Sequence, residues 1–303
     1  MKALGIDIGG TTVKAGLVDA EGRVTNRLSF PTPTSLAGFR DALRAIPLKP
    51  VVGVGFGCKG LIDAATTRVE SLPGTLSYLE GHRLDELLGT ALPATADNDA
   101  RAAMAGEMAW GAARGKSDAL MLTLGTGVGG AVIAGGNLLR GANRVAGHIG
   151  HLTVNPDGPI CLCGNRGCLE TYFSARSIEA AAIDAMRRGV ASSLLALDWR
   201  TVTCADVFDH ARSGDALAGS IAAKATSALA AAIAGLLHVL DPEVVIVGGQ
   251  ITDAGHTLFA PLTAEIAWRT KVMIRRMPPI VKPGVSDATG VAGAAALIIR
   301  TLA

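Results

Sequence analysis

Apolar and polar residues alternate through the first thirty positions in the manner of half-buried strands. We read strands at 2–8, 13–19 and 23–30, joined by short turns of which the first is Gly9-Gly10-Thr11-Thr12. Strands connected so tightly pair antiparallel. The pattern therefore predicts an antiparallel meander with an acidic residue, Asp7, at the end of its first strand.

The rest of the chain mixes short apolar runs with longer segments of helical periodicity. The short runs predict strands at 51–56, 92–96, 118–124, 131–134 and 244–247. Apolar residues three and four positions apart predict helices at 35–46, 100–110, 177–188, 203–212, 216–240 and 289–302. Strands and helices mixed in this order indicate an α/β protein.

A second strand–glycine turn–strand unit follows the first by about 120 residues, which predicts an internal duplication. Here the apolar strand at 118–124 is turned by Gly125-Thr126-Gly127-Val128-Gly129-Gly130 and returns at 131–134. A dinucleotide-binding motif would need a helix after its glycines. Because a strand pattern follows instead, we exclude that interpretation.

Both glycine turns have the composition of phosphate-binding loops. Glycine lets backbone N–H groups approach a phosphate closely, and Thr11 and Thr12 add hydroxyl donors. A carboxylate beside such a loop would repel the phosphate unless a cation lies between them, so Asp7 predicts Mg²⁺. For the first turn alone, a plain hairpin is the alternative.

Asp99 lies where the strand at 92–96 passes into the helix at 100–110. A carboxylate at such a corner can take a proton from a substrate hydroxyl as a general base. Aspartate is also a favoured N-cap residue, so Asp99 can equally serve only to begin the helix. The two roles are compatible.

Three of the five cysteines, Cys161, Cys163 and Cys168, fall within eight residues, and His151 lies ten positions before the first of them. Three thiolates and one imidazole complete a tetrahedral zinc shell and leave no position open for water. The pattern therefore predicts a structural Zn²⁺ site. An ordinary turn with reduced thiols, or one disulfide, is the alternative.

Composition narrows the class of protein further. A chain of 303 residues is long enough for two domains, and a net charge of +2 with no basic run excludes a nucleic-acid surface. Its longest apolar stretch, 225–240, is interrupted by polar residues and predicts no membrane span. The N-terminus turns polar too soon for a signal peptide, so we expect a cytoplasmic protein.

The segment from 146 to 170 resembles the consensus of the ROK family of sugar kinases (repressor, open reading frame, kinase). In that family Glu-x-Gly-His precedes Cys-x-Cys-Gly-x-x-Gly-Cys-x-Glu. The resemblance extends over the whole chain, through the motifs at 7–12, 98–99, 125–130 and 248–249. It implies a two-domain actin-like ATPase fold with an interdomain cleft, and transfer of the ATP γ-phosphoryl group to a hexose hydroxyl, glucose O6 above all.

The resemblance also implies the roles of single residues. Sugar would be held by Asn98, Asp99, His148, His151 and Glu170, with Asp99 as the catalytic base. Nucleotide would be held by Asp7, Gly9, Gly10, Thr11, Thr12, Lys14, Gly125, Thr126, Gly127, Gly129, Gly248 and Gly249. For the glycine pair at 248–249 a plain left-handed turn is the alternative. A bulky residue at Gly127 is expected to obstruct phosphates and to leave sugar binding intact.

Two segments depart from the family pattern. His148 replaces the glutamate of Glu-x-Gly-His, and residues 71–75 read Ser-Leu-Pro-Gly-Thr where the family often has Asn-Leu-Pro-Gly-Trp. Another acceptor (an N-acetylhexosamine, aminosugar, fructose, mannose or cyclitol) therefore stays open. A non-catalytic sugar-binding module is a further alternative. A DNA-binding repressor is not expected, because the first strand begins at Lys2.

The resemblance also predicts domain organisation and assembly. We expect a small α/β domain at 1–115, joined by the C-terminal helix at 289–303, and a large α/β domain at 116–288 that contains the zinc loop. A homodimer is the expected assembly. The expected small molecules are ATP, transient Mg²⁺ and a sugar.

Overall fold

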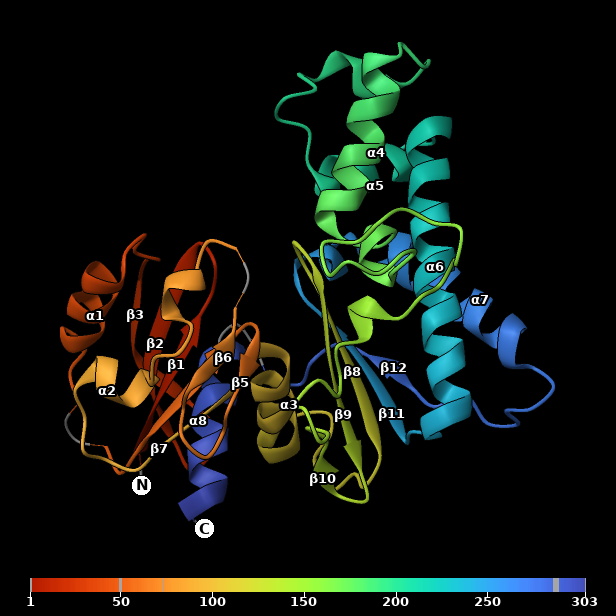
Figure 1. Ribbon diagram of the computed structural model, residues 1–303. Coiled ribbons are helices and arrows are strands. Elements are labelled where there is room, and N and C mark those ends of the chain that lie inside the picture. The colour runs from red at the N-terminus through yellow and green to blue at the C-terminus, as the bar shows by residue number, and fades with distance from the viewer. Residues whose placement is uncertain (1, 49–50, 73, 286–288, 303) are drawn as a thin grey trace. The chain divides into compact units, whose positions relative to one another are not determined.

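The computed structural model describes residues 2–48, 51–72, 74–285 and 289–302, and its elements follow the predicted order (Figure 1). The chain divides into two compact units. Unit 1 comprises Met1–Ser117, Ala131–Gly147 and Pro283–Ala303, and unit 2 comprises Asp118–Gly130 and His148–Lys282. Each unit is described below by itself.

The first sheet has five strands in the order β3-β2-β1-β4-β7. Its strands are β1 (Lys2–Ile8), β2 (Thr12–Asp19), β3 (Val24–Pro31), β4 (Val54–Cys58) and β7 (Ala94–Asn98). Strands β1, β2 and β3 pair antiparallel, which confirms the predicted meander, whereas β1, β4 and β7 pair parallel. The parallel part brings the carboxyl ends of three strands to one edge of the sheet.

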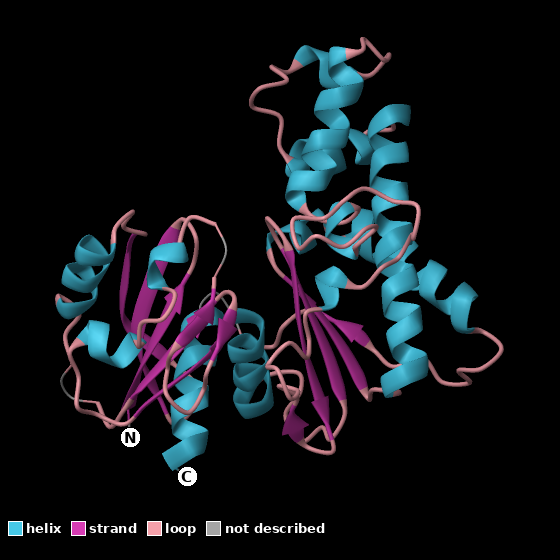
Figure 2. Ribbon diagram, in the orientation of Figure 1, coloured by secondary structure: helices cyan, strands magenta, loops and turns pink. Residues whose placement is uncertain are grey.

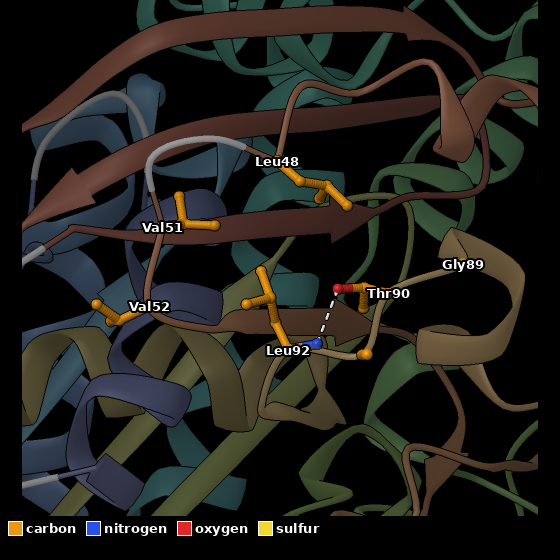
Figure 3. Close-up of a pocket in the computed structure, with 7 residues that line it drawn as sticks. Leu48, Val51, Val52, Gly89, Thr90 and Leu92 are labelled. Atoms are coloured by element: carbon orange, nitrogen blue, oxygen red, sulfur yellow. Dashed lines mark hydrogen bonds between the residues drawn. The ribbon is translucent and has the colours of Figure 1, made fainter.

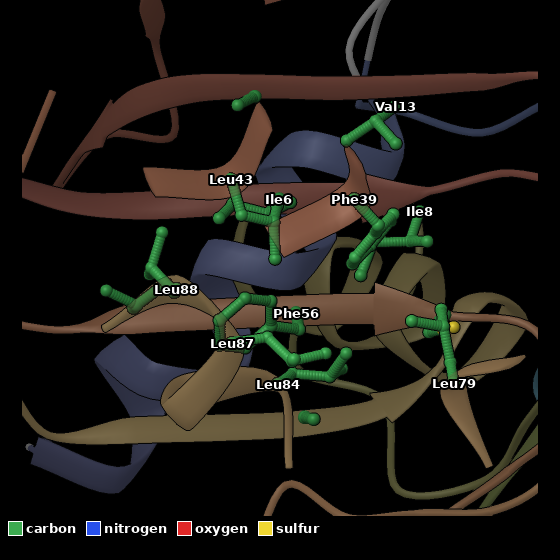
Figure 4. Packing of buried hydrophobic residues seen from close by; sticks show 14 of the residues in the cluster. Ile6, Ile8, Val13, Phe39, Leu43, Phe56, Leu79, Leu84, Leu87 and Leu88 are labelled. Atoms are coloured by element: carbon green, nitrogen blue, oxygen red, sulfur yellow. The ribbon is translucent and has the colours of Figure 1, made fainter. Parts of the chain in front are cut away.

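Helices α1 (Leu36–Arg44) and α2 (Leu84–Leu88) pack on the first sheet through a continuous apolar core (Figure 4). Ile6 and Phe56 of the sheet meet Phe39 and Leu43 of α1 there. Ser35 begins α1 as predicted, because its side chain accepts a hydrogen bond from the backbone N–H of Gly38. A small hairpin of β5 (Leu61–Ile62) and β6 (Val69–Ser71) follows β4.

Helix α8 (Thr289–Leu302) and helix α3 (Asp99–Trp110) also belong to unit 1. Residue Gly55 of β4 approaches α8 so closely that a Cβ there would collide with the carbonyl oxygen of Ala294. Gly106 of α3 would likewise place a Cβ 3.0 Å from the Cα of Gly293. Small residues therefore let α8 lie directly on both the strands and α3.

The second sheet repeats the strand plan of the first. Its order is β10-β9-β8-β11-β12, with β8 parallel to β11 and β11 parallel to β12. Its strands are β8 (Ala119–Leu124), β9 (Val128–Ala134), β10 (Asn137–Leu138), β11 (Val244–Gly248) and β12 (Ile280–Val281). The matching order agrees with the duplication that the two glycine turns predict.

Four of the described α-helices lie in unit 2, where Figure 2 draws helices in cyan. They are α4 (Ala175–Arg187), α5 (Cys204–Arg212), α6 (Ala216–Leu240) and α7 (His256–Thr270). The spacing of apolar residues predicted α4, α5 and α6. The side chains of Thr203 and Asp215 cap α5 and α6, respectively. Helix α7 was not predicted, because Pro261 interrupts its pattern. Short 3-10 helices are η1 (Ser77–Leu79), η2 (Ile149–His151), η3 (Leu169–Thr171), η4 (Ser193–Ala196) and η5 (Gln250–Ala254).

Among the described residues, α6 is the one helix long and apolar enough to cross a membrane. However, 56% of its most apolar window is buried inside the protein. A core helix passes the same test of length and composition, so α6 is weak evidence for a membrane span.

Candidate functional site

Three parallel strands of unit 1 end in a corner rich in ionisable groups. Asp7 lies near the end of β1, Cys58 ends β4, and Asn98 ends β7 immediately before Asp99. Burial and the negative charge of Asp99 raise the pKa of the Asp7 carboxyl to about 6, while Lys14 opposes the shift. The two carboxylates therefore sense each other's charge, and a divalent cation would relieve both burial and repulsion.

The first glycine turn lies beside this corner. The backbone N–H of Gly9 donates to the carbonyl of Thr12 over 3.1 Å, and the Thr32 hydroxyl donates to the carbonyl of Gly9 over 2.7 Å. A Cβ on Gly9 would lie 2.8 Å from the Thr12 carbonyl oxygen. The hairpin itself therefore needs glycine here. Lys14 pairs in register with Asp7 across the hairpin.

Asn98, not Asp99, is the N-cap of α3. The Asn98 side-chain oxygen accepts from the backbone N–H of Ala100 over 3.0 Å, and its amide donates to the Gly60 carbonyl over 3.2 Å. The interpretation of Asp99 as the helix cap was therefore wrong. Asp99 is the first residue inside α3 and is exposed, and its carboxylate accepts from the N–H of Ala100 at 2.8 Å.

Two ion pairs of the buried Asp97, which directly precedes Asn98, were not predicted. Asp97 is fully buried and accepts from the Nε of Arg101 at 2.6 Å and the Nε of Arg140 at 2.8 Å. Arg101 is 1% exposed and also donates to the carbonyls of Arg144 and Ala146. The sequence does place Asp97 and Arg101 four residues apart, a spacing that allows an ion pair. That spacing does not show whether the ion pair is buried or on the surface. The network fixes the backbone on which Asn98 and Asp99 stand.

The second glycine turn, in unit 2, is held by Glu170. The Glu170 carboxylate accepts from the backbone N–H of Val128 at 2.9 Å. The turn also closes on itself, with the N–H of Gly125 donating to the carbonyl of Gly127 over 3.0 Å. A Cβ added to Gly127 would collide with the Glu170 carboxylate. The turn expected to hold phosphate and a residue expected to hold sugar are therefore directly connected.

This contact changes the expected effect of Gly127→Val. The added side chain must displace Glu170, so we expect the sugar dissociation constant of the nucleotide-free protein to rise about tenfold, in addition to weaker ATP binding. Calorimetric titrations with sugar alone and with ATP alone measure both effects. Gly219→Ala is the matched control, since a Cβ at Gly219 of α6 meets no atom within 4 Å. Unchanged sugar affinity in Gly127→Val would show that the Glu170 contact is dispensable.

The glycine pair at 248–249, where β11 ends, is not a plain left-handed turn. Gly249 has φ 96° and ψ 166°, a region that essentially only glycine adopts. A Cβ there would also collide with the carbonyl oxygen of Leu124 in β8. The backbone thus requires Gly249, and its bare main chain follows the carboxyl end of β11. That position is suited to a flat ligand lying against the backbone, which no side chain would obstruct.

His151, Cys161, Cys163 and Cys168 come together in unit 2 with their ligand atoms within 4.8 Å of one another. The Sγ atoms of Cys163 and Cys168 are 3.6 Å apart, and the Sγ of Cys161 is 3.7 Å from the Nδ1 of His151. Tetrahedral zinc requires separations of about 3.8 Å between sulfurs and about 3.6 Å between sulfur and nitrogen, given its bond lengths. The donor set therefore fits a closed tetrahedral metal site, and the described cysteines are all free.

The chemistry of the thiols supports a cation at this cluster. Burial, together with hydrogen bonds with Cys163 and Cys161, raises the pKa of the Cys168 thiol to about 12. A thiolate is thus unfavourable at Cys168 unless a positive charge lies nearby. A divalent metal supplies that compensation and lets three thiolates coexist.

The cluster of His151 and the three cysteines lies at both ends of the segment that carries the expected sugar contacts. His151 ends η2 and Cys168 caps η3, and the N–H of Leu169 donates to the carbonyl of Leu152 over 2.8 Å. The rings of His148 and His151 lie nearly parallel, 17° apart, with centroids separated by 6.4 Å. Because the Nδ1 of His151 faces the cysteines, its Nε2 is left for another partner.

An apolar pocket in unit 1 offers none of this chemistry (Figure 3). It has a volume of about 520 Å³ and is lined by Leu48, Val51, Val52, Gly89, Thr90, Ala91 and Leu92. Its one hydroxyl, on Thr90, accepts from the N–H of Leu92 over 3.1 Å. With no ionisable lining residue, the pocket has no group for proton or phosphoryl transfer.

Two sheets of one strand order, each with a glycine turn after its first strand, define a protein of the actin-like ATPase fold. The ROK family profile matches residues 3–301, and the chain belongs to the ROK family. It is 37% identical over 316 aligned positions to a glucokinase of Thermotoga maritima (98% of this chain, 97% of the relative). It is also 37% identical over 260 positions to an N-acetylmannosamine kinase of Escherichia coli (83% and 84%).

Solved structures agree with this assignment. A ROK glucokinase of Streptomyces griseus in complex with glucose and AMPPNP superimposes with a TM-score of 0.85 and 31% identity, over 99% of this chain and all of the other. A ROK hexokinase of Thermus thermophilus superimposes with a TM-score of 0.84 and 29% sequence identity, over 100% of this chain and 99% of the other.

Proposed function

We propose that this chain transfers the γ-phosphoryl group of ATP to the O6 hydroxyl of glucose. The family match and the full-length glucokinase relatives make it an ATP-dependent sugar phosphotransferase. Glucose as the acceptor is a more specific proposal, supported by the relatives' names, and its O6 hydroxyl is what the family resemblance implies. The observation that carries it is the corner of unit 1, where Asp99 stands exposed beside Asp7 and the first glycine turn.

Each group in the proposed site has a physical task. Asp99 takes the proton of the attacking hydroxyl, a contribution of about 10² to 10⁴-fold in rate. Asp7 holds Mg²⁺ against the phosphates, and backbone N–H groups of the two glycine turns (9–12 and 125–130) receive the phosphate oxygens. Phosphoryl transfer needs positioning and charge neutralisation above all, and these groups supply both.

The remaining residue assignments belong to the same proposal. Thr11, Thr12, Lys14 and Thr126 complete the phosphate contacts, and the main chain at Gly248 and Gly249 receives the nucleoside. Sugar is held by Asn98, His148, His151 and Glu170. Asn98 retains one amide hydrogen and one lone pair after capping α3, so both roles fit one side chain.

The metal at His151, Cys161, Cys163 and Cys168 is zinc in this proposal, since soft thiolates and imidazole in a closed tetrahedral set favour it. The proposal also includes two domains, one formed by residues 1–115 together with 289–303 and the other by residues 116–288. It further includes a homodimer and a cytoplasmic location.

An assay of ADP release across about twenty sugars, with ATP and Mg²⁺, tests the proposed activity. We expect glucose to give the highest kcat/KM, with N-acetylmannosamine and mannose lower. Sugar-independent ADP release alone, together with sugar binding by calorimetry, would instead identify a sugar-binding module.

His148→Glu tests how the acceptor is recognised. A carboxylate only accepts hydrogen bonds, whereas a neutral imidazole offers one donor and one acceptor. We expect His148→Glu to raise kcat/KM for glucose about tenfold, or about 1.4 kcal/mol, by restoring an acceptor for the sugar hydroxyls. His256→Glu, at an exposed position of α7, makes the same change of charge away from the site. Identical sugar profiles for wild type and His148→Glu would show that position 148 does not set specificity.

A further inference from the structure

Lys59 follows the last residue of β4, which lies between β1 with Asp7 and β7, the strand that leads into Asp99. Strand β4 pairs with β1 on one side and with β7 on the other, so a residue just beyond Cys58 emerges in the middle of the ionisable corner. Burial raises the pKa of the Cys58 thiol, Asp99 and Asp7 raise it further, and Lys59 opposes them. All three charges therefore act on the same point of the sheet edge.

The Lys59 ammonium faces the first glycine turn. A Cβ built on Gly10 would lie 3.9 Å from the Nζ of Lys59 and 3.8 Å from the hydroxyl oxygen of Thr75. A Cβ built on Gly74 would lie 3.8 Å from the same Nζ. The ammonium thus occupies the space between two backbone segments that lack side chains, and one of these segments is the turn assigned to phosphate.

This ammonium has no protein partner among the described residues. Lys59 is half-buried, and it forms no ion pair or hydrogen bond with any residue that the structure describes. Holding a long cationic side chain in a fixed place without a partner costs rotamer entropy and partial desolvation. A cation in such a place is suited to an anionic ligand.

We propose that the ammonium group of Lys59 contacts the phosphoryl group as it passes from ATP to the acceptor, which makes Lys59 a catalytic residue. The proposal rests on the kinase activity proposed above. Asp7 and Asp99 place two carboxylates where a multiply charged phosphoryl group must arrive, and one Mg²⁺ beside Asp7 compensates only part of that charge. The Lys59 ammonium lies beside the first glycine turn, and the strand that it follows lies between β1 and β7, so its positive charge is available where the phosphoryl group arrives.

The reaction itself is balanced without Lys59 gaining or losing a proton. The acceptor oxygen forms a bond to the γ-phosphorus, the bond from that phosphorus to the bridging oxygen of ADP breaks, and Asp99 takes the hydroxyl proton. Lys59 stays protonated and stabilises charge on the transferred oxygens. Its contribution should therefore appear in kcat far more than in sugar affinity.

Three variants test the proposal. Lys59→Met keeps the length of the side chain and removes its charge, Lys59→Arg restores a cation, and Lys224→Met removes an exposed lysine of α6 as the matched control. We expect Lys59→Met to lower kcat about 10²-fold and to leave the glucose dissociation constant within about threefold. Lys59→Arg should recover at least about tenfold of that loss, and Lys224→Met should match wild type.

A second readout does not depend on the identity of the sugar. Aluminium fluoride with ADP and Mg²⁺ imitates the transferring phosphoryl group, so its addition should tighten ADP binding to the wild type in calorimetry without sugar. In Lys59→Met, the increase in ADP affinity caused by aluminium fluoride should be at least about tenfold smaller than in the wild type. The affinity for ADP alone should be unchanged. A wild type that phosphorylates no sugar would refute the proposed function, while this readout would still report on Lys59.

Two results for Lys59→Met would overturn the proposal. One is a Lys59→Met variant with kcat within about threefold of wild type and an unchanged response to aluminium fluoride. The other is a tenfold loss of glucose affinity with unchanged kcat and unchanged response to the fluoride, which would assign Lys59 to the acceptor sugar. A wild type whose ADP affinity does not respond to aluminium fluoride would also count against it.

Discussion

Replacing Asp99 by Asn should lower kcat by about 10² to 10⁴-fold and move the sugar KM by less than about threefold. The amide keeps the shape of the side chain and can still hydrogen-bond a hydroxyl, but it cannot accept the proton. Because Asn98 provides the N-cap of α3, the loss of the Asp99 charge should leave the helix and the thermal midpoint almost unchanged. Steady-state kinetics and thermal unfolding of the same preparation measure both quantities.

Two other aspartates serve as controls for Asp99→Asn. Asp41→Asn changes an exposed carboxylate of α1 and should behave as wild type. Asp97→Asn should lower stability, because it leaves Arg101 and Arg140 facing a neutral group in a buried network. If Asp99→Asn keeps kcat within about threefold of wild type, Asp99 is not the base.

Cys163→Ser should release the metal and destabilise unit 2. Cys163 is the one exposed cysteine of the cluster, so its replacement creates little cavity and acts mainly through the lost ligand. Structural zinc sites contribute several kcal/mol to folding, so we expect a loss of at least about 3 kcal/mol. Sugar affinity should fall as well, since the cluster joins η2 with His151 to η3 with Glu170.

The control for Cys163→Ser lies in the same loop. Leu162→Ser alters the adjacent side chain, which is 86% exposed, and should keep both metal content and stability. Elemental analysis of protein purified without chelators should find one zinc per chain in the wild type and near none in Cys163→Ser. A wild type without zinc would contradict the assignment of the cluster.

Most of the longer elements could be predicted from the sequence because each is locally encoded, whereas α2 and the short strands β5, β6, β10 and β12 were not. The alternation at 2–30 produced the meander, and Ser35 and Thr203 mark helix starts that the structure confirms. Helix α7 was missed because a proline in its interior breaks the local signal. Burial against the rest of unit 2, through Leu258, Leu262 and Ile266, stabilises that helix instead.

The chemistry of the site was predictable where neighbours in sequence are neighbours in space, as at Cys161, Cys163 and Cys168. It was not predictable where strands bring distant residues together. The hydrogen bond between Glu170 and Val128 of the second glycine turn joins residues that are 42 positions apart in the sequence. The ion pair of Arg140 with Asp97 joins residues that are 43 positions apart. The parallel order β1-β4-β7 places Lys59 in the corner, and no local pattern carries that order.

Identification of the product is the most direct test of the central claim. Purified protein, ATP, Mg²⁺ and glucose should yield ADP and glucose 6-phosphate in equal amounts, seen by phosphorus and proton nuclear magnetic resonance, and Asp99→Asn should abolish nearly all of both. No phosphorylated sugar from glucose or any other hexose, under conditions where ATP and sugar both bind, would contradict the account.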